Sequence, residues 1–379
     1  QKFLEKGEKY EGKRLIKQAH RDAVKYNFVH LACELSNTLY FHYVYYERNR
    51  KKAADYAKQV DHYLEAYRLE KKAEFYVFEV IAQTKGSVDF AYLEKAIHEL
   101  QALEGKSLKF CTYQFMLLVI HGFHTMRYKF VVDICYEALQ FYQDKNGVYI
   151  SHYHFFYTNL GIAQMAIKKH EEAEQTFSEA VNYIHPRSIN EYILALYRTI
   201  NFIHAGQYRV AYDLYRQHRK CRFEDVRQQF AMIEAYLCFL SHMGYFQLDR
   251  IFRLGKYLNE TFKAQADKQG QNIAILIAEL LVYLARDRGK FIDRVDAIKH
   301  YSYRHLKNRD TSRAKRFIKI LCLMPRANFK SDVLERLAKN DIQYLHDHPI
   351  CMGENVSIEI IPFETLLQMI FLQLKEKVA

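Results

Sequence analysis

The stretch that decides the fold is YHFFYTNLGIAQMAIKKHEEAEQTFSEAVNYIHP, which spans Tyr153–Pro186. Its first half carries Tyr157, Leu160 and Gly161. Its second half carries Ala173, Phe177 and Ala180, a small, large, small order at helical spacing. Two antiparallel helices pack closely only where small residues lie at their crossing and bulky side chains fill the space beside it. The stretch therefore predicts a hairpin of two helices.

Weaker copies of the second-helix pattern lie on both sides of this hairpin. They begin at Val131, Ala211 and Leu248, so the four copies, Ala173 included, start 42, 38 and 37 residues apart. The pattern resembles the tetratricopeptide repeat superfamily, in which helix pairs stack side by side with a regular repeat of about 34 residues. The larger steps predict longer helices or looser turns than in a regular array.

Helical periodicity continues outside these copies. Further helix pairs are expected at residues 31–46 with 53–67, 73–84 with 92–103, 273–285 with 291–306, and 312–323 with 333–345. Residues 356–362 alternate apolar and polar side chains, as an extended segment does, and residues 363–375 form a last amphipathic helix. We therefore expect an all-α fold: a right-handed α-solenoid of about eight antiparallel helix pairs with a C-terminal capping helix.

The composition is consistent with one long helical array. Half of the residues are apolar, and only 4 Pro and 13 Gly interrupt the chain, which favours long helices over β structure. We treat residues 1–379 as a single repeat domain, because each pair in such an array contacts only its neighbours. Its parts are degenerate pairs (1–105), the best-matching repeats (107–258), basic C-terminal pairs (269–347), and the extended segment with the capping helix (356–377).

Cysteine usage and hydropathy bear on the cellular location. The 7 Cys residues are widely spread and form no CxxC pair, so neither a disulfide framework nor a zinc knuckle is indicated. The longest strongly apolar run, Ile273–Ala285, is shorter than the roughly 18 residues that a membrane span needs. No secretory leader is visible, although one that preceded Gln1 would not be seen. We expect a cytoplasmic protein without a membrane partner.

Sequence signals of catalysis are absent. The chain contains no glycine-rich phosphate loop and no GxSxG, HExxH or calcium-loop motif. His121 and His124 share a helix face, but no carboxylate or thiol at matching spacing completes a metal site. We therefore expect no catalytic residue, no metal ion, no cofactor and no enzymatic activity.

The resemblance implies a concave inner surface that the first helix of each pair lines. These positions are usually polar in binding repeats, whereas here they are apolar. This apolar strip comprises Tyr113, Met116, Ile120, Phe155, Ile162, Met165, Ile193, Leu196, Ile200, Phe230 and Ile233. A helix that is apolar all round must be buried on all sides. Either the array closes on itself, or another element covers the strip, or a peptide or partner helix fills it.

The preferred function is a non-enzymatic interaction scaffold, or a peptide-responsive regulator, that binds a peptide or partner helix on the apolar strip. The chain length and the strip are also similar to those of Rap-type peptide-sensing regulators, in which a helical array closes around a short peptide. No N-terminal helix-turn-helix is evident, so a DNA-binding version of such a regulator is not expected. An exposed extended segment at residues 356–362 would be a candidate homodimer contact.

The alternative function is association with nucleic acid. The net charge is +12, and residues 286–330 contain 14 Lys and Arg against 4 Asp. The candidate phosphate contacts are Arg304, Lys307, Arg309, Arg313, Arg316 and Lys319. A concentrated positive field attracts phosphate backbones. The other interpretation of this basic cluster is a solvent-exposed helix face whose charge balances acidic residues elsewhere in the chain.

Overall fold

A computed structural model describes residues 9–83, 89–105, 107–255, 257–258, 269–305, 312–348, 350 and 359–376 of the chain. Within these ranges the protein forms sixteen helices and no strand, which confirms the all-α prediction. The helices fall into two compact units, an N-terminal unit of residues 1–160 and a C-terminal unit of residues 161–379.

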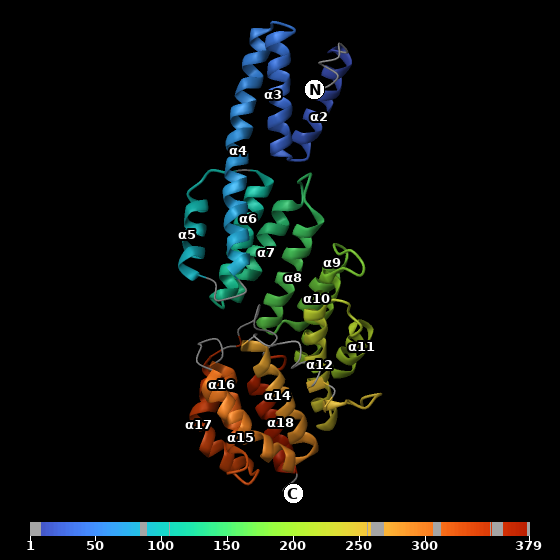
Figure 1. Cartoon of the computed structure of the whole chain (residues 1–379), viewed down its shortest axis with the longest axis vertical. Coiled ribbons are helices and arrows are strands. Elements are labelled where there is room, and N and C mark those ends of the chain that lie inside the picture. Colours follow the sequence, from blue (N-terminus) through green and yellow to red (C-terminus); the bar gives the residue numbers. More distant parts are fainter. Residues whose placement is uncertain are drawn as a thin grey trace. The chain divides into compact units, whose positions relative to one another are not determined.

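The order of the helices along the chain can be followed in Figure 1. The N-terminal unit contains α2 (Lys9–Lys25), α3 (Val29–Tyr45), α4 (Arg50–Gln83), α5 (Phe90–Gln101), α6 (Leu108–His124), α7 (Tyr128–Tyr142) and most of α8 (Ile150–Ala166). The C-terminal unit contains α9 (His170–Val181), α10 (Ile189–His204), α11 (Tyr208–His218), α12 (Glu224–His242), α14 (Gln269–Arg286), α15 (Arg288–His305), α16 (Ser312–Leu323), α17 (Ser331–Asp347) and α18 (Phe363–Glu376).

One tight turn recurs in four helical hairpins. It joins α2 to α3, α6 to α7, α8 to α9 and α10 to α11, and each time three residues separate the two helices. The middle residue has positive φ in every case: Asn27, Met126, Lys168 and Gly206. The third residue then donates its backbone N–H to the carbonyl five residues earlier, at 2.8 to 2.9 Å. These are the features of the Schellman helix end, which satisfies carbonyls that the helix leaves unpaired.

The hairpin predicted from Tyr153–Pro186 is present as α8 and α9. Ala173, Phe177 and Ala180 are fully buried. A Cβ atom added to Gly161 would lie 2.4 Å from the Phe177 ring, so the ring occupies the space that a side chain at 161 would need. The small and large residues therefore meet as the helix-crossing argument requires.

The predicted break between residues 67 and 73 is wrong. Helix α4 runs without interruption for 34 residues and covers both segments that were expected to be separate helices. The intervening residues, Arg-Leu-Glu-Lys-Lys at positions 68–72, are all strong helix formers and include neither Gly nor Pro. Nothing in the local sequence stops the helix there.

Leu248, at which the fourth copy was predicted to begin, does not lie in a helix. Helix α12 ends at His242, and Gly244 with φ +84° turns the chain into an irregular segment that contains Leu248. Asp249 fixes this segment, because it accepts hydrogen bonds from Arg209 at 3.0 Å and from Arg216 at 2.6 Å. Two ion pairs thus attach this irregular segment to helix α11.

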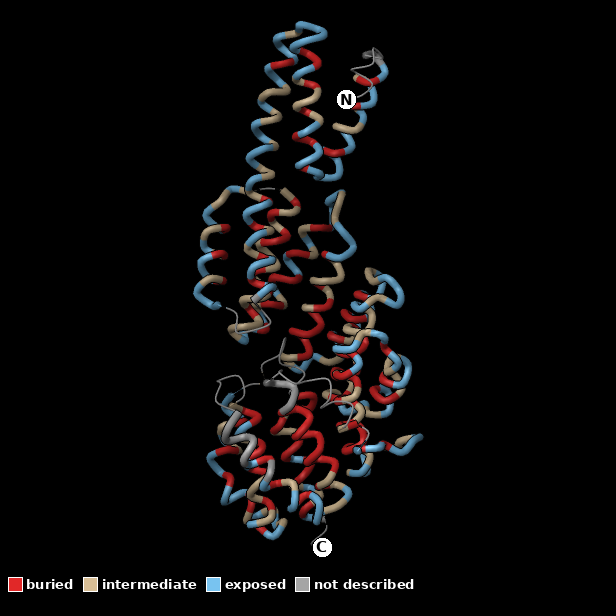
Figure 2. Tube along the Cα trace, in the orientation of Figure 1, coloured by how far each residue is buried: buried red, intermediate tan, exposed pale blue. Residues whose placement is uncertain are grey.

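The core of the C-terminal unit is built around α12 and α14, which pack against each other and are buried along most of their length (Figure 2). The helix expected at residues 363–375 is confirmed as α18. Its first residue, Phe363, stacks on Phe317 of α16 with ring centroids 4.4 Å apart. Of the expected extended segment, residues 359–362 are described and form neither helix nor strand, whereas residues 356–358 lie outside the described part.

Candidate functional site

The apolar strip has different surroundings in the two units. In the C-terminal unit, Ile193 is half-buried and the other strip residues are buried: Ile162, Met165, Leu196, Ile200, Phe230 and Ile233. The C-terminal segment contacts the end of α10, where the His204 ring donates to the carbonyl oxygen of Ile360 at 2.9 Å. Burial lowers the pKa of His204 to about 4, so this ring is neutral at pH 7. In this unit the strip is interior to the chain itself.

In the N-terminal unit the strip remains partly accessible. Met116 and Ile120 of α6 are half-buried, and so is Phe155 of α8. Tyr113 is buried, and its ring packs edge-on against Phe78 of α4 with centroids 6.4 Å apart. The Phe78 side chain is 56% exposed. We call the surface formed by Phe78, Tyr113, Met116 and Ile120 the α4–α6 face.

A charged cluster closes one end of the α4–α6 face. Glu74 of α4 lies 2.6 Å from the ammonium of Lys71 and 3.0 Å from that of Lys109, and it also accepts from the Tyr113 hydroxyl at 3.3 Å. Burial acts to raise the pKa of Glu74, but the hydrogen bonds from the two lysines outweigh it and the pKa is lowered. Glu74 is therefore a fixed negative charge whose neighbours already neutralise it.

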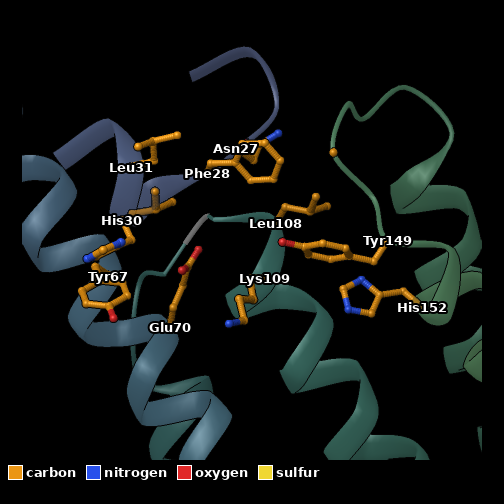
Figure 3. A pocket seen from close by; sticks show the side chains of 12 residues that line it. Asn27, Phe28, His30, Leu31, Tyr67, Glu70, Leu108, Lys109, Tyr149 and His152 are labelled. Carbon is orange, nitrogen blue, oxygen red and sulfur yellow. The ribbon is translucent and has the colours of Figure 1, made fainter. Parts of the chain in front are cut away.

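A cavity of about 280 Å³ opens one helical turn before Glu74 (Figure 3). It is formed by the α2–α3 turn, α4, the start of α6, and the loop that leads into α8. The lining residues are Asn27, Phe28, Val29, His30, Leu31, Tyr67, Glu70, Leu108, Lys109, Gly147, Tyr149 and His152. We call it the Glu70 pocket.

Two contacts join the walls of the Glu70 pocket. The Asn27 side-chain amide donates to the carbonyl oxygen of Asn146 at 2.9 Å. Beside it Gly147 has φ +83°, and a Cβ atom there would lie 1.9 Å from the carbonyl oxygen of Tyr26. Only glycine fits this approach of two backbones, so the α2–α3 turn and the loop before α8 meet closely.

The floor of the pocket carries two buried polar groups. Glu70 is 4% exposed, and among the described residues its Oε1 atom has no hydrogen-bond partner. Burial raises the pKa of Glu70, although a hydrogen bond from Ser107 and the charge of Lys109 oppose that effect. His152 is 8% exposed, and its Nδ1 atom likewise lacks a partner within the described ranges. Burial, and then the Lys109 charge, lower the pKa of His152 to about 4.

The basic residues singled out from the sequence do not form one exposed patch in the described part of the chain. Arg313 is 8% exposed and bonds the carboxylates of Glu359 and Glu364, each at 2.6 Å. Arg316 and Lys319 both pair with Asp341, at 2.6 and 2.7 Å. Lys307 and Arg309 lie outside the described residues, and Arg304 belongs to α15 but its side chain is not described. The Arg313 guanidinium is engaged by these carboxylates inside the unit, and phosphate contact by the basic residues stays a prediction.

The described residues also bear on metal ligation and membrane insertion. They contain no group of three or more His, Cys, Asp or Glu side chains that could hold a metal ion. His121 stacks on Phe90 with ring centroids 5.4 Å apart, which is a packing role. Across the ranges that the structure describes, no helix is both long and apolar enough to cross a membrane.

Comparison with protein-family models, with curated proteins and with solved structures finds no significant match to this chain.

Proposed function

We propose that this protein is a non-enzymatic interaction protein of the tetratricopeptide-like class, a right-handed solenoid of helix pairs that binds a peptide or partner helix. The recurring hairpin turn supports this proposal. Helices α7, α9 and α11 begin at residues 128, 170 and 208, which are 42 and then 38 residues apart, as the sequence copies are. Equal turns at near-equal steps are expected when one helix-pair unit is repeated along the chain.

The observation that carries the binding role is the α4–α6 face. It is formed by α4 and α6, and it combines an exposed Phe78 ring with the half-buried Met116 and Ile120. Burying one large apolar side chain contributes about 1.5–3 kcal/mol. An amphipathic helix or an extended peptide that covered this face would gain that energy from several side chains, which is the physical basis of groove recognition.

The apolar strip of the C-terminal unit is assigned a structural role and not a binding role. Because Ile200 and Ile233 are buried by the chain itself, they stabilise the unit and do not offer a ready surface. The partner-binding face is accordingly assigned to the N-terminal unit. The six described cysteines are all free, which agrees with a reducing, cytoplasmic location.

The experiment is a capture assay from a lysate of the native host with the full chain as bait and mass spectrometry as readout. Phe78→Asp should reduce capture of the partner by about tenfold or more, which corresponds to about 1.4 kcal/mol. Phe41→Asp is the matched control, because Phe41 is a 47% exposed phenylalanine on α3. Equal loss in both variants, or unchanged capture by Phe78→Asp, would refute the assignment of the face.

A further inference from the structure

We propose that the Glu70 pocket binds a small organic cation, an alkylammonium or guanidinium group, with the Glu70 carboxylate as its hydrogen-bond acceptor. The group could belong to a free amine or to a Lys or Arg side chain of a peptide. The recognition chemistry is the same in both cases. This inference does not depend on whether the α4–α6 face binds a partner.

The first argument is the state of the Glu70 carboxylate. A buried polar atom without a hydrogen-bond partner costs free energy, and a buried carboxylate without a nearby counter-charge costs more. The charges of Lys71 and Lys109 act on Glu70, but their ammonium groups pair with Glu74, at 2.6 and 3.0 Å. The Oε1 atom of Glu70 is left without a bond from any described residue, and Glu70 lines the cavity (Figure 3).

The second argument is the aromatic lining around this carboxylate. Phe28, Tyr67 and Tyr149 come from the α2–α3 turn, α4 and the loop before α8. Tyr67 is fixed by the His30 ring, whose centroid lies 4.8 Å from its own. Aromatic faces attract ammonium and guanidinium groups through the ring quadrupole, by about 0.5–2 kcal/mol per contact. Aromatic walls over a buried acceptor suit a cation better than a neutral or anionic ligand.

The third argument is size. A volume of about 280 Å³ lies just below the range of about 300–1,000 Å³ for pockets that hold drug-sized ligands. It matches one long side chain or a small amine with a few water molecules. The neutral His152 ring, which also lines the cavity, adds one further polar group without adding positive charge at pH 7.

The surroundings also predict a pH dependence. The titratable and charged groups around Glu70 are His30 of α3, Tyr67, Lys71 and Glu74 of α4, Lys109 of α6, Tyr149, and His152 of α8. Burial holds the pKa of Glu70 above its usual value. A bound cation favours the ionised carboxylate, so binding releases a proton wherever Glu70 is partly protonated. Affinity should then fall as the pH is lowered through the pKa of Glu70.

Isothermal titration calorimetry on the full chain tests the proposal with four probes. Propylguanidinium and propylammonium supply the cation in free form, and an acetylated, amidated Gly-Arg-Gly peptide supplies it as a side chain. Propylurea has the shape of the guanidinium without its charge. We expect at least one cationic probe to bind at least about tenfold more tightly than propylurea. A tenfold difference in affinity corresponds to about 1.4 kcal/mol. Binding of the free cations alone, or of the peptide alone, identifies the source.

The decisive variant is Glu70→Gln, which keeps the shape of the side chain and removes its charge. We expect it to weaken binding of the cation by about tenfold or more. Glu65→Gln is the matched control, because it removes the same charge from an exposed position of the same helix, and it should bind like the wild type. As a single variant, Tyr149→Ala should weaken binding of the cation by a factor of about two to five relative to the wild type.

Three results would overturn the proposal. They are no heat of binding for any cationic probe at millimolar concentration, equal affinity for propylurea and propylguanidinium, and unchanged affinity in Glu70→Gln. Circular dichroism and a thermal melt show that the variant is folded. Since Glu70→Gln removes a buried charge, its melting temperature should not fall, and loss of binding then reports on the carboxylate.

Discussion

Gly147 and Tyr26, which are far apart in the chain, meet backbone to backbone: a Cβ atom at 147 would lie 1.9 Å from the Tyr26 carbonyl oxygen. Gly147→Ala should therefore destabilise the protein in two ways. The φ of +83° costs a residue with a Cβ about 1–2 kcal/mol, and the clash must also separate the two segments. We expect a total loss of about 2–4 kcal/mol in urea denaturation. We also expect weaker binding of cationic probes, because the pocket walls move apart.

Gly206→Ala is the control for this prediction. Gly206 has a similar φ of +74°, but no atom lies within 4 Å of the added Cβ. Only the conformational cost remains, and we expect a loss of about 1–2 kcal/mol. If the two variants lost equal stability, the close backbone contact at Gly147 would contribute nothing to the free energy of unfolding.

Gly161 and Phe177 give a prediction about the hairpin that decides the fold. Gly161→Ala places a methyl group 2.4 Å from the Phe177 ring, so the ring or the helix must shift. Overpacking of this kind costs about 1–3 kcal/mol. The double variant Gly161→Ala with Phe177→Leu should recover part of that loss in thermal denaturation, because the smaller side chain makes room. Strictly additive losses would show that the two sites do not contact each other.

Arg313 gives a prediction about the C-terminal segment. Its guanidinium donates to Glu359, to Glu364 and, at 2.7 Å, to the carbonyl oxygen of Leu345. Arg313→Met leaves the buried Glu359 without its partner, and breaking such a pair costs about 3–5 kcal/mol. The double variant Arg313→Met with Glu359→Gln should be more stable than Arg313→Met alone. A double-mutant cycle in urea measures this coupling, and a coupling energy near zero would contradict it.

The buried histidines predict a loss of stability in acid. The pKa of His152 and that of His204 both fall to about 4 in the fold, while in the unfolded chain the value is about 6.5. Above pH 6.5 both states are neutral. As the pH falls below 6.5 the unfolded chain gains protons that the fold excludes, so each histidine should cost about 2 kcal/mol between pH 7.5 and pH 5.

His204→Gln provides the test of that pH effect. The variant loses a hydrogen bond at every pH, so its absolute stability is not the readout. What should change is the difference in the free energy of unfolding between pH 7.5 and pH 5, which should shrink by about 2 kcal/mol. An unchanged difference would show that His204 takes up a proton in the folded state as readily as in the unfolded chain.

Local sequence predicted individual helices well. The Gly161, Ala173 and Phe177 pattern located α8 and α9, and apolar spacing located α16 and α18, because helix periodicity and close packing at a crossing depend on residues near in sequence. The prediction was wrong at residues 68–72, which continue helix α4, and at Leu248. Leu248 lies in an irregular segment after Gly244, where Asp249 pairs with Arg209 and Arg216 of helix α11.

The candidate site was less predictable. The apolar strip was visible from the sequence, but its burial in one unit and its accessibility around Met116 and Ile120 were not. Glu70 lay in the break that was expected between two helices, where it had no distinguishing signal. No local signal shows that Glu70 faces a cavity, because the α2–α3 turn and the loop before α8 enclose it from elsewhere in the chain.

By itself, then, the sequence determined that the chain is helical, where most helices begin and end, and which faces are apolar. Those properties follow from backbone hydrogen bonding and side-chain spacing over one or two turns. Only the tertiary structure decided which apolar faces are covered, that Arg313 is buried in ion pairs, and that Glu70 lines a cavity with one oxygen unbonded by any described residue. Burial and charge pairing depend on residues brought together from distant positions, and local spacing carries no information about them.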